Sequence, residues 1–171
     1  MSAADTATAV DRETAWLTTT GDGLPALLTS AGGPWDVIQA YATRTPAQRQ
    51  SQIYVLRRGF ATDRWSQQRR MPSYRMHLAC LWPVGGTTTG TGIAEDEQRA
   101  FDNALALLVQ RIEAFVGDKS HGGRFLNVAD AEAGPGSRVD VTFDDPVQTI
   151  TNGAYLSAQV TYTANDTDYV M

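Results

Sequence analysis

One segment of this chain constrains the fold more than any other, because its large apolar residues recur with the period of an α-helix. They follow one another at spacings of four, three, four and three residues: Phe101, Leu105, Leu108, Ile112 and Phe115. Three consecutive acids stand at the start of this stripe, and Gly117 can end it. The pattern predicts an amphipathic helix over residues 94–116, whose apolar side must be covered by the rest of the chain.

The segments on either side of this helix have the patterns of β-strands. Residues 53–56 form a short β-branched and aromatic run, and residues 74–82, 139–144 and 156–164 alternate apolar with polar side chains. Such strands typically pair antiparallel, with one face on a core and the other toward solvent. The sequence therefore predicts an α+β fold, in which helices flank a small mixed or antiparallel β-sheet with a long β-hairpin.

The two ends of the chain carry weaker signals. A length of 171 residues is that of one domain, so we expect a single domain over residues 1–171. Residues 1–10 are rich in Ala and Thr and are predicted to form a flexible arm, and residues 165–171 a flexible tail. Residues 11–45 are interrupted by glycines and Pro34, and are interpreted as a helical subdomain whose second short helix spans residues 35–43.

The net charge of −5 conceals a strong segregation along the chain. Residues 44–75 hold eight arginines and a single acid, Asp63, whereas the segments before and after them carry net charges of −4 and −8. A chain with separate positive and negative regions is suited to head-to-tail contact with a second copy of itself. The alternative is that the arginines pair with acids of the same subunit.

The most basic part of this segment lies between the first two predicted strands. It is too polar for a core and too long for a tight turn, so it is predicted to be a long hairpin that projects from the sheet. The residues expected to contact another subunit or a partner are Arg57, Arg58, Arg64, Trp65, Arg69 and Arg70. Because these arginines are interleaved with Phe60, Trp65 and Tyr74, a nucleic-acid contact is an alternative, although the chain as a whole is acidic.

The residue types that carry most enzymatic chemistry are scarce. The two histidines, His77 and His121, have no spacing that indicates a metal site, and the single Cys80 excludes a disulfide within the chain and a cysteine-based zinc site. Neither the glycines at 85–92 nor the turn at 134–138 completes a phosphate loop or a serine-nucleophile motif. Asp144 and Asp145 precede Pro146 and are interpreted as turn residues. We therefore expect no catalytic residues, no metal and no cofactor.

Membrane and export signals are also missing from the sequence. The longest apolar run, residues 104–109, is much shorter than the roughly 20 residues that cross a bilayer. The first residues lack the basic and apolar parts of a secretory signal. We expect a protein that is made and used in the cytoplasm.

The order of these elements resembles the tail-terminator family of long-tailed bacteriophages. Residues 53–60 and 74–82 look like the paired strands of that family. Residues 94–112 look like its flanking helix, and residues 156–162 like its closing strand. The resemblance covers residues 11–165 and is one of pattern, because the family has no short diagnostic motif.

The resemblance implies a structural virion protein that forms a ring, expected to be hexameric, at the head-proximal end of the tail tube. Such a ring ends tail polymerisation and joins the tail to the head–tail connector or stopper protein. Its partners are then other copies, the tail-tube protein and the connector, while genomic DNA passes through the lumen without specific binding. The elaborated Gly32-Gly33-Pro34-Trp35 region is unusual for the family and leaves a head–tail stopper or adaptor as the alternative.

Overall fold

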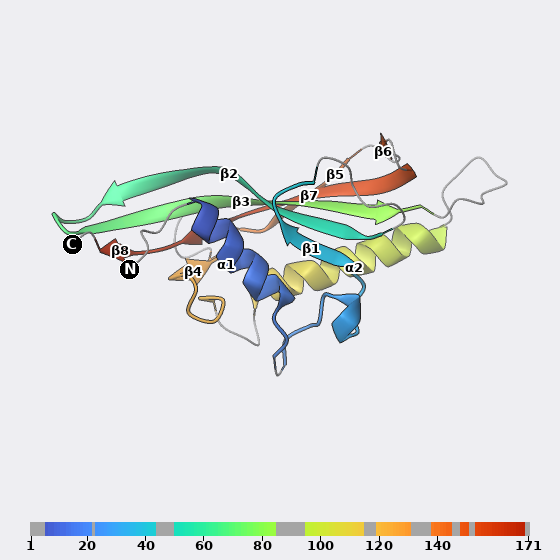
Figure 1. The fold of residues 1–171 in the computed structure, drawn as a ribbon, viewed down its shortest axis with the longest axis horizontal. Helices are drawn as coiled ribbons and strands as arrows, with labels where there is room; N and C mark the ends of the chain where they lie inside the picture. The colour runs from blue at the N-terminus through green and yellow to red at the C-terminus, as the bar shows by residue number, and fades with distance from the viewer. Residues whose placement is uncertain are drawn as a thin grey trace.

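Two helices cover one face of a twisted β-sheet in the computed structural model (Figure 1). The structure describes residues 6–21, 23–43, 50–84, 95–114, 119–130, 138–144, 148–150 and 153–169. In chain order the elements are α1 (Thr6–Thr18), the 3-10 turn η1 (Thr29–Ala31), β1 (Val37–Ala40), β2 (Gln52–Arg64), β3 (Arg69–Pro83), α2 (Glu95–Glu113), β4 (Asn127–Val128), β5 (Asp140–Phe143), β6 (Gln148–Ile150), β7 (Gly153–Asn165) and β8 (Asp168–Tyr169).

The sheet is mixed, with the order β1-β2-β3-β7 at its centre. β1 pairs parallel to β2, whereas the pairs β2–β3 and β3–β7 are long and antiparallel. Three short strands, β4, β5 and β6, pair with β7, and β8 pairs with the start of β3. The α+β class with a long hairpin, predicted from the alternation of residues, is therefore confirmed.

The predicted amphipathic helix is confirmed as α2 (Glu95–Glu113). Its apolar stripe is buried at Phe101, Leu105, Leu108 and Ile112, while Phe115 and Gly117 lie outside the described residues. Trp35, which is fully buried, packs edge-on against Trp82 with ring centres 5.4 Å apart. α2 thus covers the sheet with the stripe that its sequence predicts.

The predicted helix at residues 35–43 is wrong, because this segment contains the parallel strand β1. Ser51 fixes its start, since the Ser51 backbone N–H donates to the Asp36 carboxylate at 3.0 Å and the Asp36 and Val37 N–H groups donate to the Ser51 carbonyl. Tyr41, with a φ of 64°, ends the strand. The helical subdomain expected over residues 11–45 is therefore one helix, α1, followed by a turn and a strand of the main sheet.

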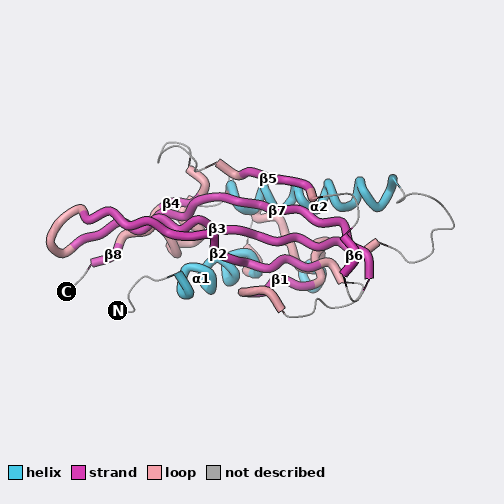
Figure 2. The backbone as a smooth tube through the Cα atoms, turned by 90° about the horizontal axis from the view of Figure 1, so that it is seen from above, coloured by secondary structure: helices cyan, strands magenta, loops and turns pink. Residues whose placement is uncertain are grey.

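Both predictions of loose termini are wrong for the residues that the structure describes. α1 begins at Thr6, and Ala9 and Val10 are fully buried in the main core. At the other end, Asp166 is buried, and its carboxylate accepts a hydrogen bond from Arg12 of α1 at 2.8 Å. Residues 168–169 then form β8, which extends the hairpin side of the sheet (Figure 2).

The two faces of the sheet differ in what covers them. The face toward α1 and α2 carries the main core, which joins residues of both helices and of the central strands in one cluster. The opposite face carries a smaller cluster of Tyr54, Leu81 and Tyr155. In the described part of the chain, no helix has the length and apolar character needed to cross a membrane.

Candidate functional site

The basic hairpin predicted from the sequence is formed by β2 and β3, and we call its residues 57–75 the arm. A β-bulge between Arg57 and Gly59 marks its base, and the strands then stay paired as far as Arg64 and Arg70. At about 3.3 Å per residue, the six residues of β2 beyond the bulge span about 20 Å. Figure 1 shows the arm at one end of the molecule, where it extends past α1.

The C-terminal strands brace the arm. β7 follows β3 as far as the pair Ser73 and Asn165, and β8 pairs with β3 at Arg69 and Arg70. The Arg69 Nε–H donates to the Thr167 hydroxyl at 3.0 Å, and the Asp166 N–H donates to the Pro72 carbonyl at 2.9 Å. The arm is therefore a three-stranded projection, whose backbone is paired up to Arg69 and Arg70.

Two of the predicted contact residues lie at the base of the arm. Arg57 is exposed, and its guanidinium carbon lies 5.1 Å from the centre of the Tyr41 ring. Arg58 is also exposed and lines a hollow of about 330 Å³ together with Arg75 and Asp140. The other predicted contact residues gather at the tip.

Arginines surround a hollow at the tip of the arm, which we call the basic hollow. It has a volume of about 300 Å³ and is lined by Thr62, Arg64, Ser66, Gln67, Arg69 and Arg70. Arg64 and Arg70 are register partners on β2 and β3, which places like charges opposite each other, and Asp168 of β8 is the register partner of Arg70 on its other side. The hollow combines fork-shaped donors with hydroxyl and amide groups, which suits it to binding carboxylates or other anions.

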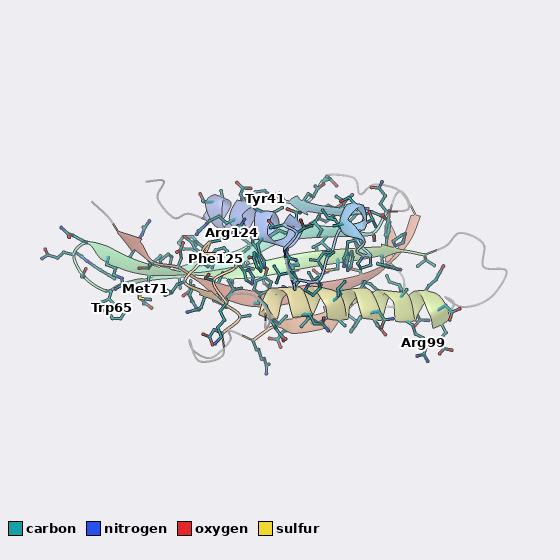
Figure 3. All side chains as sticks on the ribbon, turned by 90° about the horizontal axis from the view of Figure 1, so that it is seen from below. Tyr41, Trp65, Met71, Arg99, Arg124 and Phe125 are labelled. Atoms are coloured by element: carbon teal, nitrogen blue, oxygen red, sulfur yellow. The ribbon has the colours of Figure 1, made fainter. Side chains whose placement is uncertain are left out.

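Trp65 gives the tip an aromatic side. Its side chain is 65% exposed, and the Arg69 guanidinium carbon lies 5.0 Å from its ring centre. Trp65 also borders a second groove of about 630 Å³, between the arm and the residues before β4, whose other lining residues include Leu126, Asn127 and Asn165. Leu126 is 45% exposed, so this groove offers apolar surface beside its amides. Figure 3 shows Trp65 and Met71 together at this end of the molecule.

Sequence analysis missed a buried polar cluster beneath α1. Glu13 and His121 are both fully buried, with Glu13 Oε2 2.8 Å from His121 Nδ1. His121 Nε2 lies 2.8 Å from the Ile112 carbonyl, and the Tyr162 hydroxyl donates to Glu13 Oε1 at 2.5 Å. Burial, together with the adjacent Glu13, raises the pKa of Tyr162 well above its ordinary value. Because every member is sealed from solvent, we interpret the cluster as a link between α1, α2 and β7 rather than as a reactive site.

Arg111 of α2 extends this internal polar structure. Its guanidinium donates to the carbonyls of Pro25 at 2.9 Å and Trp16 at 2.8 Å, and also to the Thr19 carbonyl. Burial lowers the pKa of Arg111, while Glu13 acts in the opposite direction. Arg111 thus satisfies carbonyls at the end of α1 and in the turn that follows it.

The other residues considered for chemistry occupy structural positions where they are described. Cys80 is fully buried on β3, and this burial raises its thiol pKa. His77 Nε2 is hydrogen-bonded to Gln159, whose amide donates to Asp144 at 2.9 Å. The glycines at 85–92, the turn at 134–137 and Asp145 lie outside the described residues. Within the described ranges, no group of three or more His, Cys, Asp or Glu residues is arranged to hold a metal ion.

Comparison with known proteins does not assign the chain to a family. No protein-family model matches the sequence, and no curated protein matches it either. The function must therefore be argued from the arm, the buried cluster and the distribution of charge.

Proposed function

We propose that this protein is a structural component of a long-tailed bacteriophage, a tail terminator whose copies form a ring at the head-proximal end of the tail tube. In this role the ring ends tail polymerisation and joins the tail to the connector or stopper protein. The proposal includes no enzymatic step and no cofactor. A ring of six copies and a place in the neck of the virion follow from the family resemblance.

The observation that carries the proposal is the braced, exposed arm with its basic hollow. Exposed ion pairs contribute only about 0 to 1 kcal/mol to a monomer, and like charges placed opposite each other reduce its stability. The arm nevertheless carries six arginines against one acid over residues 57–75. Its exposed arginines, Arg57, Arg58 and Arg64, therefore offer positive charge to an anionic surface outside the subunit.

The order of elements agrees with that on which the family resemblance rests. The long hairpin, the amphipathic helix and the terminal strands follow one another in that order, after α1 and the strand β1. In the proposed assembly, Arg64, Arg69 and Arg70 bind carboxylates of a neighbouring copy or of the tail-tube protein, and Trp65 adds apolar contact area. Arg57 and Arg58 lie nearer the body of the subunit, at the base of the arm.

Self-assembly of the purified chain tests the proposal. Sedimentation velocity over a concentration series, with negative-stain micrographs of the same samples, should reveal closed rings with a channel wide enough for duplex DNA. Ring formation should weaken with rising salt, because the contact is between charges. A chain that stays monomeric at every concentration, and that does not bind the end of phage tail tubes, would contradict it.

A nucleic-acid contact is the second candidate, favoured by one observation. Phe60 and Trp65, both on the arm, are 57% and 65% exposed, and exposed aromatics beside arginines can stack on bases. A nucleic-acid contact by the arm requires tight DNA binding with a steep salt dependence. Titration of the full chain with single-stranded and duplex DNA separates the two candidates, since a ring that lets DNA pass should bind it weakly.

A stopper or adaptor role differs from the terminator role in the partner that the ring contacts.

A further inference from the structure

The end of the molecule opposite the arm carries the opposite charge. α2 begins there with Glu95, Asp96 and Glu97, and Asp102 follows two turns later. Figure 3 shows Arg99 of α2 at one extreme of the molecule and Trp65 of the arm at the other. The subunit is therefore elongated, with a basic tip at one end and an acidic helix start at the other.

This second end also exposes an aromatic ring. Phe143 of β5 is 57% exposed and packs edge-on against Phe101 of α2, with ring centres 6.2 Å apart. The side chain of Glu95 is 75% exposed and is ion-paired with Arg99 four residues later, and Asp96 and Asp102 are exposed as well. We call the surface formed by Glu95, Asp96, Asp102 and Phe143 the acidic end.

A role in helix stability explains only part of this surface. Carboxylates in the first turn favour a helix through its dipole by about 0.3 to 1 kcal/mol each. That effect falls off within the first turn, so it does not account for Asp102, and it has no bearing on the exposure of Phe143. The acidic end thus has negative charge beside an exposed aromatic ring, and the tip of the arm has positive charge beside an exposed aromatic ring.

We propose that the tip of the arm in one copy docks on the acidic end of the next copy. The basic hollow then receives carboxylates of α2, while Trp65 packs toward Phe143. Because each copy offers two different surfaces at opposite ends, the contact is head-to-tail and can close into a ring. This inference rests on the proposed self-assembly and names the surfaces that carry it.

Charge reversal on each surface tests the contact in the full-length chain. The variant Arg64→Glu/Arg70→Glu reverses the charge at the tip of the arm and leaves Arg69 packed on Trp65. The variant Glu95→Lys/Asp96→Lys reverses the acidic end. Each should weaken association about tenfold or more in sedimentation velocity, because close charge pairs at interfaces couple strongly. Phe143→Ser should also weaken association, and it leaves the charges of the helix start unchanged.

A variant that carries all four charge reversals, which we call the combined chain, tests whether the two surfaces contact each other. The tip of its arm is acidic and its helix start basic, so the copies should again associate with one another. Two controls reverse exposed charges elsewhere: Asp11→Lys on α1, and Lys119→Glu before β4, which also removes an exposed ion pair with Asp130. Neither control should change association, and circular dichroism should confirm that every variant is folded.

The outcomes separate this inference from the proposed function. If wild-type rings form and reversal of the acidic end leaves them intact, the arm docks elsewhere, and only the inference is wrong. If the combined chain does not recover association, the inference is again wrong and the proposed function is unaffected. If the wild-type chain neither associates nor binds tails, while reversal of the arm abolishes DNA binding, the inference and the proposed function are both wrong.

Discussion

Arg111 in the core and Arg64 at the tip of the arm are the same residue type in opposite surroundings. Arg111 is fully buried and donates to carbonyls of Trp16, Thr19 and Pro25. Arg64 is exposed and faces Arg70 across the hairpin. One arginine holds segments of a single subunit together, whereas the other is placed against a like charge and gains little within the subunit. The fold should therefore depend strongly on the first and hardly at all on the second.

Arg111→Ala should have the largest effect on stability. The substitution leaves a cavity and removes the donor from three carbonyls, so the free energy of unfolding should fall by about 3 to 5 kcal/mol. Arg64→Ala is the matched control and should change it by less than about 0.5 kcal/mol. Urea denaturation of both variants measures the difference. If both variants lost the same free energy of unfolding, the core and the tip of the arm would not differ in their importance for folding.

Leu108→Ala tests the packing of α2 and should rank next. Leu108 is fully buried in the middle of the helix stripe, so truncation should cost about 2 to 5 kcal/mol. Ala106, exposed on the same helix, offers a control through Ala106→Ser, with an expected change below about 0.5 kcal/mol. A loss under about 1 kcal/mol for Leu108→Ala would show that α2 does not depend on the stripe.

Tyr162→Phe should have a smaller effect, with a characteristic pH dependence. It deprives the buried Glu13 of a hydrogen-bond donor, at a cost of about 1 to 3 kcal/mol near neutral pH. The folded-state pKa of Tyr162 is raised, so its stabilising contribution is complete below the unfolded value of about 10 and is lost as pH rises above it. The gap between wild type and Tyr162→Phe should therefore narrow in urea titrations above about pH 10. A gap that stays constant would argue against the burial of this hydroxyl.

The sequence predicted α2 and the arm because their signals are local. The helix stripe repeats within one segment, and the arginines of the basic hollow are neighbours along the hairpin. β1 was missed because four residues, Val37–Ala40, are too few to show a period, and the glycines and proline before them suggest a break. β8 was missed because it depends on pairing with β3 rather than on its own residues.

The buried cluster was beyond sequence analysis for a different reason. Its members come from distant positions, since Glu13 lies 108 residues before His121 and 149 before Tyr162. Glutamate is mostly exposed in proteins, and histidine and tyrosine are buried to an intermediate degree, so none of the three indicates a core position by its type. Only the tertiary fold brings them together, so the residues around His121 in the sequence do not reveal its partners.

Removal of the tip tests most directly whether the arm serves assembly rather than folding. Residues 64–70 can be replaced by Asn-Gly, a two-residue turn that closes the hairpin at the paired residues Asp63 and Met71. Sedimentation velocity and urea denaturation of this variant should show lost ring formation, with unfolding free energy within about 1 kcal/mol of wild type. Cys80 should stay unreactive toward a thiol reagent, since it is buried on β3. Rings that still form, or a chain that unfolds and exposes Cys80, would contradict the account.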